Sequence, residues 1–167
     1  YHLGQEICHK PEQLAVALAR NWKEGQADIA NGQLLAWFRD VQKDQNVVRL
    51  LLEMRGQMNL SVHLQLLQLI LHLAPGIPPV WKGETIELST ILGYANKALK
   101  GEKEAAHWLD DLYQHRVLEV YAAAGNRQAA DLVHRWGRAL DLFDDAWHSK
   151  LAIISQHSAA RDPDTVA

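Results

Sequence analysis

The chain has 167 residues, of which 48% are hydrophobic and 22% charged, and its net charge is −3. This balance allows one globular domain with a sizeable core and excludes intrinsic disorder. No basic stripe is visible, which argues against nucleic-acid binding. The most apolar stretch, residues 60–74, is too short for a membrane span. The one cysteine, Cys8, excludes an intrachain disulfide and fits a reducing compartment, so we expect a cytoplasmic protein without membrane contact.

The N-terminal part of the chain predicts a flexible entry followed by a helix. Residues 1–10 lack periodicity and are expected to be flexible. Pro11 suits the first turn of a helix. Leu14, Leu18 and Trp22 then fall on one face at helical spacing.

Three further helices are predicted before residue 75. Gly25 weakens the first helix without necessarily ending it, and the Asn31-Gly32 pair is a turn or cap signal. A short helix follows, and either Asp44 or Asn46 could cap the next. Ser61 is expected to cap a last helix that reaches Leu73. That helix has only a narrow polar stripe, so it should be the most buried in the domain.

A stiff loop rich in Pro and Gly, residues 75–86, divides the chain. It joins two halves, 11–74 and 87–157. We expect them to form a single helical domain over 11–157, because 74 residues of helix alone would have a poor core. Residues 158–167 are polar and are expected to be a disordered tail.

The second half contains a phrase that is written twice. Residues 101–109 read GEKEAAHWL and residues 125–133 read GNRQAADLV. Both place Gly before a helix with two alanines, which is typical of helical hairpins and of stacked helical repeats. The similarity is either a true duplication or a chance likeness of two Ala-rich helices. We therefore predict an all-α fold of antiparallel helical hairpins, arranged as a short repeat-like solenoid or as an orthogonal bundle.

The last helix is predicted to start near Arg127, and Gly137 could bend or interrupt it. A tail helix could then reach Gln156. Its apolar stripe consists of Leu140, Phe143, Trp147 and Leu151.

Two features indicate where a partner could bind. Residues 101–148 carry nine acids against five bases, which gives either a solvated surface or a face for a basic partner. Trp81 follows two prolines in the loop, so it is either a docking residue or a plug that packs the loop onto the helices. We take Trp81, Asp110, Asp111 and His107 as the candidate partner-binding residues.

Nine histidines raise the possibility of a metal site. His107, Asp111, His115 and Glu119 are each four apart, but His107 and His115 would lie about 12 Å apart along a helix and could not share one ion. A tight site needs three or four ligands. His63, alone on an apolar face, is typical of a satisfied core histidine. We predict no metal and no cofactor, and no nucleotide-binding loop is present.

Three stretches resemble helical accessory segments of large bacterial proteins that carry eukaryotic-like Ser/Thr kinase or Hsp70-like domains. They are ARNWKEGQADIANGQLLAWF (19–38), LAPGIPPVWKGETI (73–86) and YAAAGNRQAADLVHRW (121–136). The resemblance carries no catalytic motif, so it implies a non-catalytic helical module. The chain begins at Tyr1 and ends in a polar segment, and we expect it to be a piece of a longer protein.

The sequence therefore predicts a non-enzymatic interaction or scaffolding module whose partner is another protein or another domain of the same chain. Two other functions stay open. One is a metal- or small-molecule-binding sensor or enzyme that uses His63, His107 and Asp111. The other is a self-association domain, and the sequence leaves the oligomeric state open.

Overall fold

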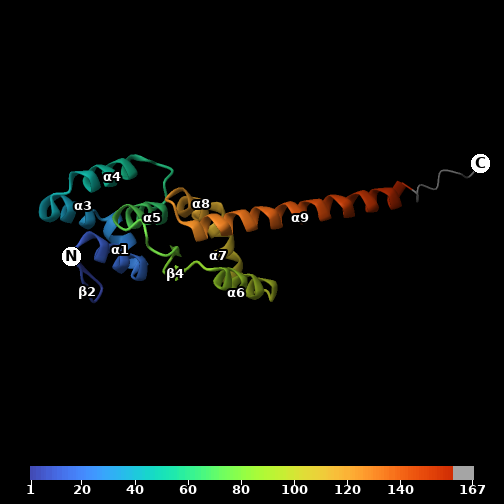
Figure 1. Cartoon of the computed structure of the whole chain (residues 1–167), viewed down its shortest axis with the longest axis horizontal. Coiled ribbons are helices and arrows are strands. Elements are labelled where there is room, and N and C mark those ends of the chain that lie inside the picture. Colours follow the sequence, from blue (N-terminus) through green and yellow to red (C-terminus); the bar gives the residue numbers. More distant parts are fainter. Residues whose placement is uncertain (160–167) are drawn as a thin grey trace, which may run out of the picture. The chain divides into compact units, whose positions relative to one another are not determined.

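The computed structural model describes residues 1–159, and most of them are helical, with two short strand pairs (Figure 1). The predicted all-α class and its helical hairpins are confirmed. The described residues fall into two compact units that divide between Ala130 and Asp131, and the single domain over 11–157 stays a prediction. No helix within the described residues is both long and apolar enough to cross a membrane.

The N-terminus is an ordered hairpin, so the predicted flexible entry over 1–10 is wrong. Strand β1 (His2–Leu3) pairs antiparallel with β2 (Glu6–Ile7), and Gly4 takes a positive φ of 58° in the turn. Two-residue strands are too short to show a period in the sequence. Leu3 and Cys8 are buried, which fixes the hairpin against the helices.

The predicted first helix is two helices, α1 (Pro11–Arg20) and α2 (Trp22–Ala30). The break falls at Asn21, whose side-chain amide donates to the carbonyl of Ala17 and to Glu6 of the hairpin. Gly25 lies inside α2 and does not end it. Helix α3 (Gln33–Trp37) follows and runs into a π-helical turn, Phe38–Gln42.

Helix α4 (Gln45–Gly56) is capped by Asp44, whose carboxylate accepts from the amides of Asn46 and Val47. Helix α5 (Val62–Leu73) is capped by Ser61, whose hydroxyl accepts from the amide of Leu64. Both caps are among those predicted. Helix α5 packs against α1, α2 and α4 and contributes most to the core of this half. Its buried residues are Leu66, Leu67, Leu69, Ile70, Leu71 and Leu73.

The loop expected over 75–86 contains a second hairpin, in which β3 (Val80–Trp81) pairs with β4 (Glu84–Thr85). Lys82 and Gly83, the two turn residues, have φ angles of 52° and 87°. Two positive φ values in a two-residue turn match the twist of an antiparallel hairpin. Strands of two residues again give no signal in the sequence.

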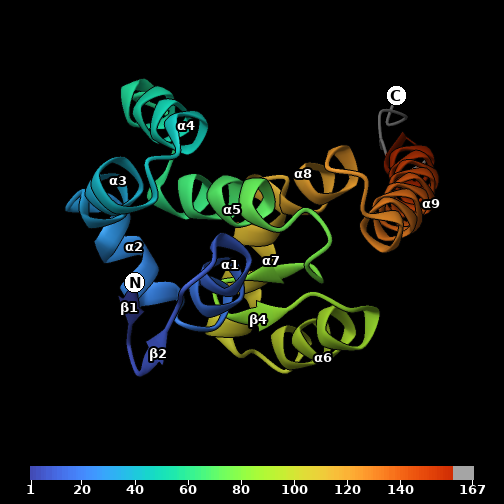
Figure 2. The same cartoon turned by 60° about the vertical axis from the view of Figure 1, so that its left-hand side comes forward.

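Helices α6 (Leu88–Leu99), α7 (Lys103–Gln114) and α8 (Val117–Ala123) complete the first unit, and α6 packs against α7 (Figure 2). The two glycines of the duplicated phrase, Gly101 and Gly125, have φ angles of 92° and 90°. In both turns the glycine amide donates to the carbonyl three residues before it, and the amide of the next residue donates to the carbonyl five residues before it. This is the Schellman ending of a helix, so the two copies make the same chain reversal.

Helix α9 (Arg127–Ala159) is continuous, so Gly137 does not interrupt it. It passes the predicted end at Gln156 and enters the predicted tail, 158–167. Residues 160–167 lie outside the described residues.

Candidate functional site

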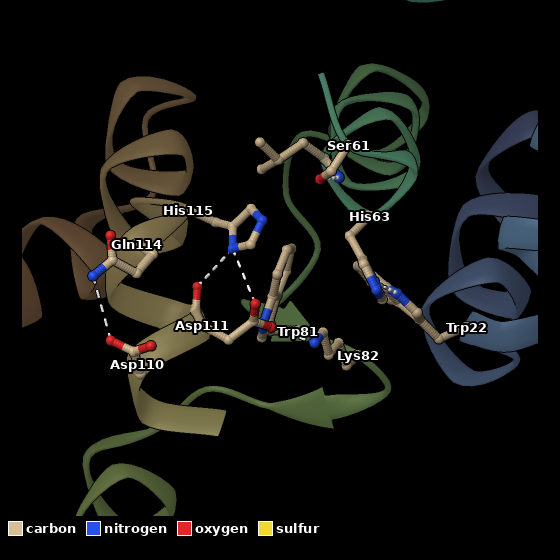
Figure 3. A network of polar contacts seen from close by, with 10 residues as sticks. Trp22, Ser61, His63, Trp81, Lys82, Asp110, Asp111, Gln114 and His115 are labelled. Carbon is tan, nitrogen blue, oxygen red and sulfur yellow. Dashed lines mark hydrogen bonds and ion pairs between the residues drawn. The ribbon is translucent and has the colours of Figure 1, made fainter. Parts of the chain in front are cut away.

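Trp81 lies at the centre of a cluster of aromatic and polar side chains (Figure 3). Its side chain is fully buried. The indole ring contacts the rings of Trp22, His63 and His115, with centroids 5.6, 5.6 and 5.4 Å away. These contacts join the β3–β4 hairpin to α2, to α5 and to the end of α7. We call Trp22, His63, Trp81, Lys82, Asp111 and His115 the Trp81 cluster.

Asp111 on α7 is the charged centre of this cluster. Its carboxylate pairs with the ammonium of Lys82 and accepts a hydrogen bond from the indole N–H of Trp81 at 3.3 Å. The Nδ1 atom of His115 lies 3.2 Å from the same carboxylate. Burial alone would raise the pKa of Asp111, but Lys82, with His115 and Trp81, outweighs it and holds that pKa below its ordinary value.

His63 on α5 is a hydrogen-bond acceptor. The indole N–H of Trp22 donates to its Nδ1 atom at 3.0 Å, which requires Nδ1 to carry no proton. Burial, together with the positive charges of Lys82 and His115, lowers the pKa of His63 and outweighs the opposing charge of Asp111. His63 is therefore a half-buried histidine whose Nδ1 atom has a hydrogen-bond partner.

Tyr121 on α8 holds the hairpin from a third direction. Its hydroxyl accepts from the amide of Val80 at 2.9 Å and donates to the carbonyl of the same residue at 2.9 Å. The side chain is fully buried, and this burial raises the pKa of Tyr121 to about 12 despite the hydrogen bond to Val80.

The cluster's acids and bases are directed at one another. The Nδ1 atom of His115 lies 2.9 Å from the carbonyl of its own helix at Asp111, and Lys82 also lies over the Trp81 ring, 5.9 Å from its centroid. Within residues 1–159, no three His, Cys, Asp or Glu side chains come together in an arrangement that could hold a metal ion. These contacts therefore have a structural role: they connect the β3–β4 hairpin to α2, α5 and α7.

The structure separates the predicted partner-binding residues. Trp81 and Asp111 meet in the interior, and Trp81 takes the plug arrangement. His107 and Asp110 are exposed on α7, where Asp110 accepts a hydrogen bond from Gln114. Partner contact by these residues stays a prediction, and only His107 and Asp110 offer it an open surface.

Lys82, a member of the cluster, and Tyr121, which binds the backbone of Val80, are residues that the sequence does not reveal. Lys82 is separated from Asp111 by 29 positions, and the ion pair depends on the turn that gives Lys82 its positive φ. Tyr121 belongs to the ordinary apolar face of α8, with Val117 and Leu118. No local pattern marks either residue.

A second feature, on the surface, also escapes a reading of the sequence. All twelve residues of α6 are described, and only Ile91 is buried. Leu88, Leu92 and Leu99 are 42%, 53% and 87% exposed. With Ala95 they are spaced by four, three and four positions, so they form one stripe along the helix. We call these four residues the α6 stripe; their spacing was the available signal.

No protein-family model, curated protein or solved structure matches the chain.

Proposed function

We propose that this chain is a non-catalytic helical interaction module that docks onto another protein or another domain through α6. The observation that carries the proposal is the α6 stripe. Fully burying a leucine side chain is worth about 1.5–3 kcal/mol, so a partner that covers the exposed parts of these three leucines would gain a fraction of that energy from each. Exposed apolar residues gathered on one element are typical of interaction surfaces.

The Trp81 cluster supports this proposal from the inside. Its ion pair and ring contacts connect the β3–β4 hairpin, which leads directly into α6, to three other helices. A rigid base of this kind limits the entropy that α6 loses when a partner binds. The cluster's titratable groups thus have a structural task that requires no chemistry on a substrate.

Site-specific photo-crosslinking tests the proposal. A photoreactive amino acid replaces Leu92 on α6 or, as a matched control, Leu52 on α4, which is also 53% exposed. In an extract of the source cells, we expect adducts of defined mass from position 92 and few from position 52. Equal labelling at both positions, or no adduct from position 92, would contradict the proposal. Replacing exposed Asp110 in the same way tests the predicted acidic face.

A further inference from the structure

We propose that the partner of the α6 stripe is a second copy of this chain, and that the two α6 helices pair antiparallel across a two-fold axis. This inference rests on the proposed function, because it names the occupant of the same surface. It differs from that proposal in committing to self-association.

The α6 stripe is symmetric about the point between Gly93 and Tyr94. Reversal of the helix places Leu88 on the position of Leu99, and Leu92 on the position of Ala95. A two-fold interface requires such self-complementarity, because each residue meets its mirror position on the other copy. In this register Leu88 of each copy packs against Leu99 of the other, and the smaller Ala95 admits the larger Leu92.

The ends of the helix carry opposite charges. Exposed Glu87 directly precedes the stripe and exposed Lys100 directly follows it. Antiparallel pairing brings the acidic end of each helix beside the basic end of the other, and it opposes the two helix dipoles favourably. Parallel pairing would place like charges together. Glu84 adds negative charge near the acidic end of α6, and Lys103 adds positive charge near its basic end. Glu102 and Glu104, also near the basic end, reduce this difference in charge.

The size of the surface sets the strength of the pairing. A helix of twelve residues is about 18 Å long, and three leucines per copy give an interface at the small end of the specific range. We therefore expect a reversible dimer with a dissociation constant of roughly 10 µM to 1 mM. Such a dimer would form at high protein concentration or when the chain is part of a larger assembly.

Sedimentation equilibrium over a concentration series is the primary test. We expect dimers of the wild-type chain, and an increase of at least tenfold in the dissociation constant for Leu92→Glu. Leu52→Glu, at an equally exposed position on α4, should leave the constant unchanged. Circular dichroism checks that both variants keep the helical fold.

Charge exchange tests the orientation. Glu87→Lys and Lys100→Glu should each weaken self-association roughly 3–10-fold, because each change acts twice in a symmetric dimer. An equimolar mixture of the two variants should recover the wild-type affinity, because the acidic variant then faces the basic one.

Disulfide trapping fixes the register. In an oxidised mixture, Leu88→Cys and Leu99→Cys chains should crosslink with each other in preference to themselves. The native Cys8 is buried and takes no part. Preferential crosslinking of the Leu88→Cys chain with itself would overturn the antiparallel arrangement.

The results separate the two proposals. A wild-type chain that stays monomeric to millimolar concentration, or a dimer that Leu92→Glu does not weaken, overturns self-pairing. If position 92 then crosslinks to a different protein, the proposed function stands with another partner. If position 92 gives no adduct either, both proposals fail.

Discussion

A single hydroxyl group satisfies both backbone groups of Val80: Tyr121 accepts from its amide and donates to its carbonyl, each at 2.9 Å. Val80 pairs with Thr85 in the hairpin, and the next residue out, Ile86, donates its amide to Pro79. In an antiparallel ladder, hydrogen-bonded pairs alternate with pairs that are not hydrogen-bonded. Because Pro79 and Ile86 are hydrogen-bonded, Val80 and Thr85 are not, and the N–H and C=O of Val80 point away from β4. Tyr121 therefore supplies the partner that a third strand would otherwise provide.

The first prediction concerns this contact. Tyr121→Phe leaves two buried backbone groups without a partner, each worth about 1–3 kcal/mol, so the free energy of unfolding should fall by about 2–6 kcal/mol. Urea denaturation measures the change. The control is Tyr94→Phe, whose ring stacks on Trp108 and is retained by Phe, and it should cost less than about 0.5 kcal/mol.

The same pair of variants has a signature at alkaline pH. The raised pKa of Tyr121 means that the folded state favours the protonated phenol, so this stabilisation is present below about pH 10 and is lost as the pH rises through about 12. Tyr121→Phe should flatten the loss of stability above pH 10, whereas Tyr94→Phe should alter it less. An unchanged alkaline profile in Tyr121→Phe would show that its hydroxyl is not buried.

The second prediction concerns acid. Protonation of His63 at Nδ1 removes the acceptor for Trp22, and its lowered pKa means that stability is present above the ordinary histidine value and falls as the pH drops below about 6.5. His63→Asn keeps an acceptor but does not titrate, so its stability should change less between pH 7.5 and 5. The exposed His107→Asn is the control. NMR of the imidazole nitrogens should show an unprotonated Nδ1 at neutral pH.

The third prediction uses two adjacent aspartates on α7. Asp111→Asn removes the charge that pairs with Lys82 and should cost about 1–3 kcal/mol, whereas the exposed Asp110→Asn should stay within about 0.5 kcal/mol. The lowered pKa of Asp111 stabilises the fold above about pH 4, and this contribution is lost as the pH falls further. Asp111→Asn should flatten that acid limb. Equal losses of unfolding free energy in the two variants would contradict a central role of Asp111 in the cluster.

The fourth prediction contrasts two helical glycines. A Cβ atom at Gly93 on α6 would meet nothing within 4 Å, so Gly93→Ala should stabilise the chain by about 0.5–1 kcal/mol through helix propensity. A Cβ atom at Gly25 on α2 would lie 2.8 Å from Leu18 and 3.2 Å from Leu66. Gly25→Ala should therefore destabilise by about 1–3 kcal/mol. Thermal unfolding of both variants measures the difference, and shifts of the same sign would contradict it.

The parts of the fold that sequence reasoning predicts are those that local chemistry decides. Asp44 and Ser61 cap their helices because a short polar side chain can reach the free amides of the next turn. Gly101 and Gly125 end theirs because a positive φ costs glycine little. Each of these signals lies within a few residues of its effect.

The parts that escape prediction depend on distant contacts or on very short elements. The break at Asn21 interrupts a helix that periodicity continues. The Asn21 side chain donates to the carbonyl of Ala17, which also accepts from its backbone amide, and it reaches Glu6 of the N-terminal hairpin. The pairing of Lys82 with Asp111 exists only once the hairpin and α7 are both in place. The prolines before Trp81 could indicate that it packs as a plug, but they could not indicate its neighbours.

The closed N-terminal hairpin also gives the chain an internal reporter of local opening. The amino group of Tyr1 donates to the carbonyl of Cys8 at 2.7 Å, the amide of Cys8 donates back at 2.7 Å, and burial raises the pKa of the thiol. A thiol reagent can therefore reach this sulfur only when the first eight residues detach. Global unfolding exposes the same sulfur, so labelling of Cys8 that is faster than global unfolding allows would measure this local opening.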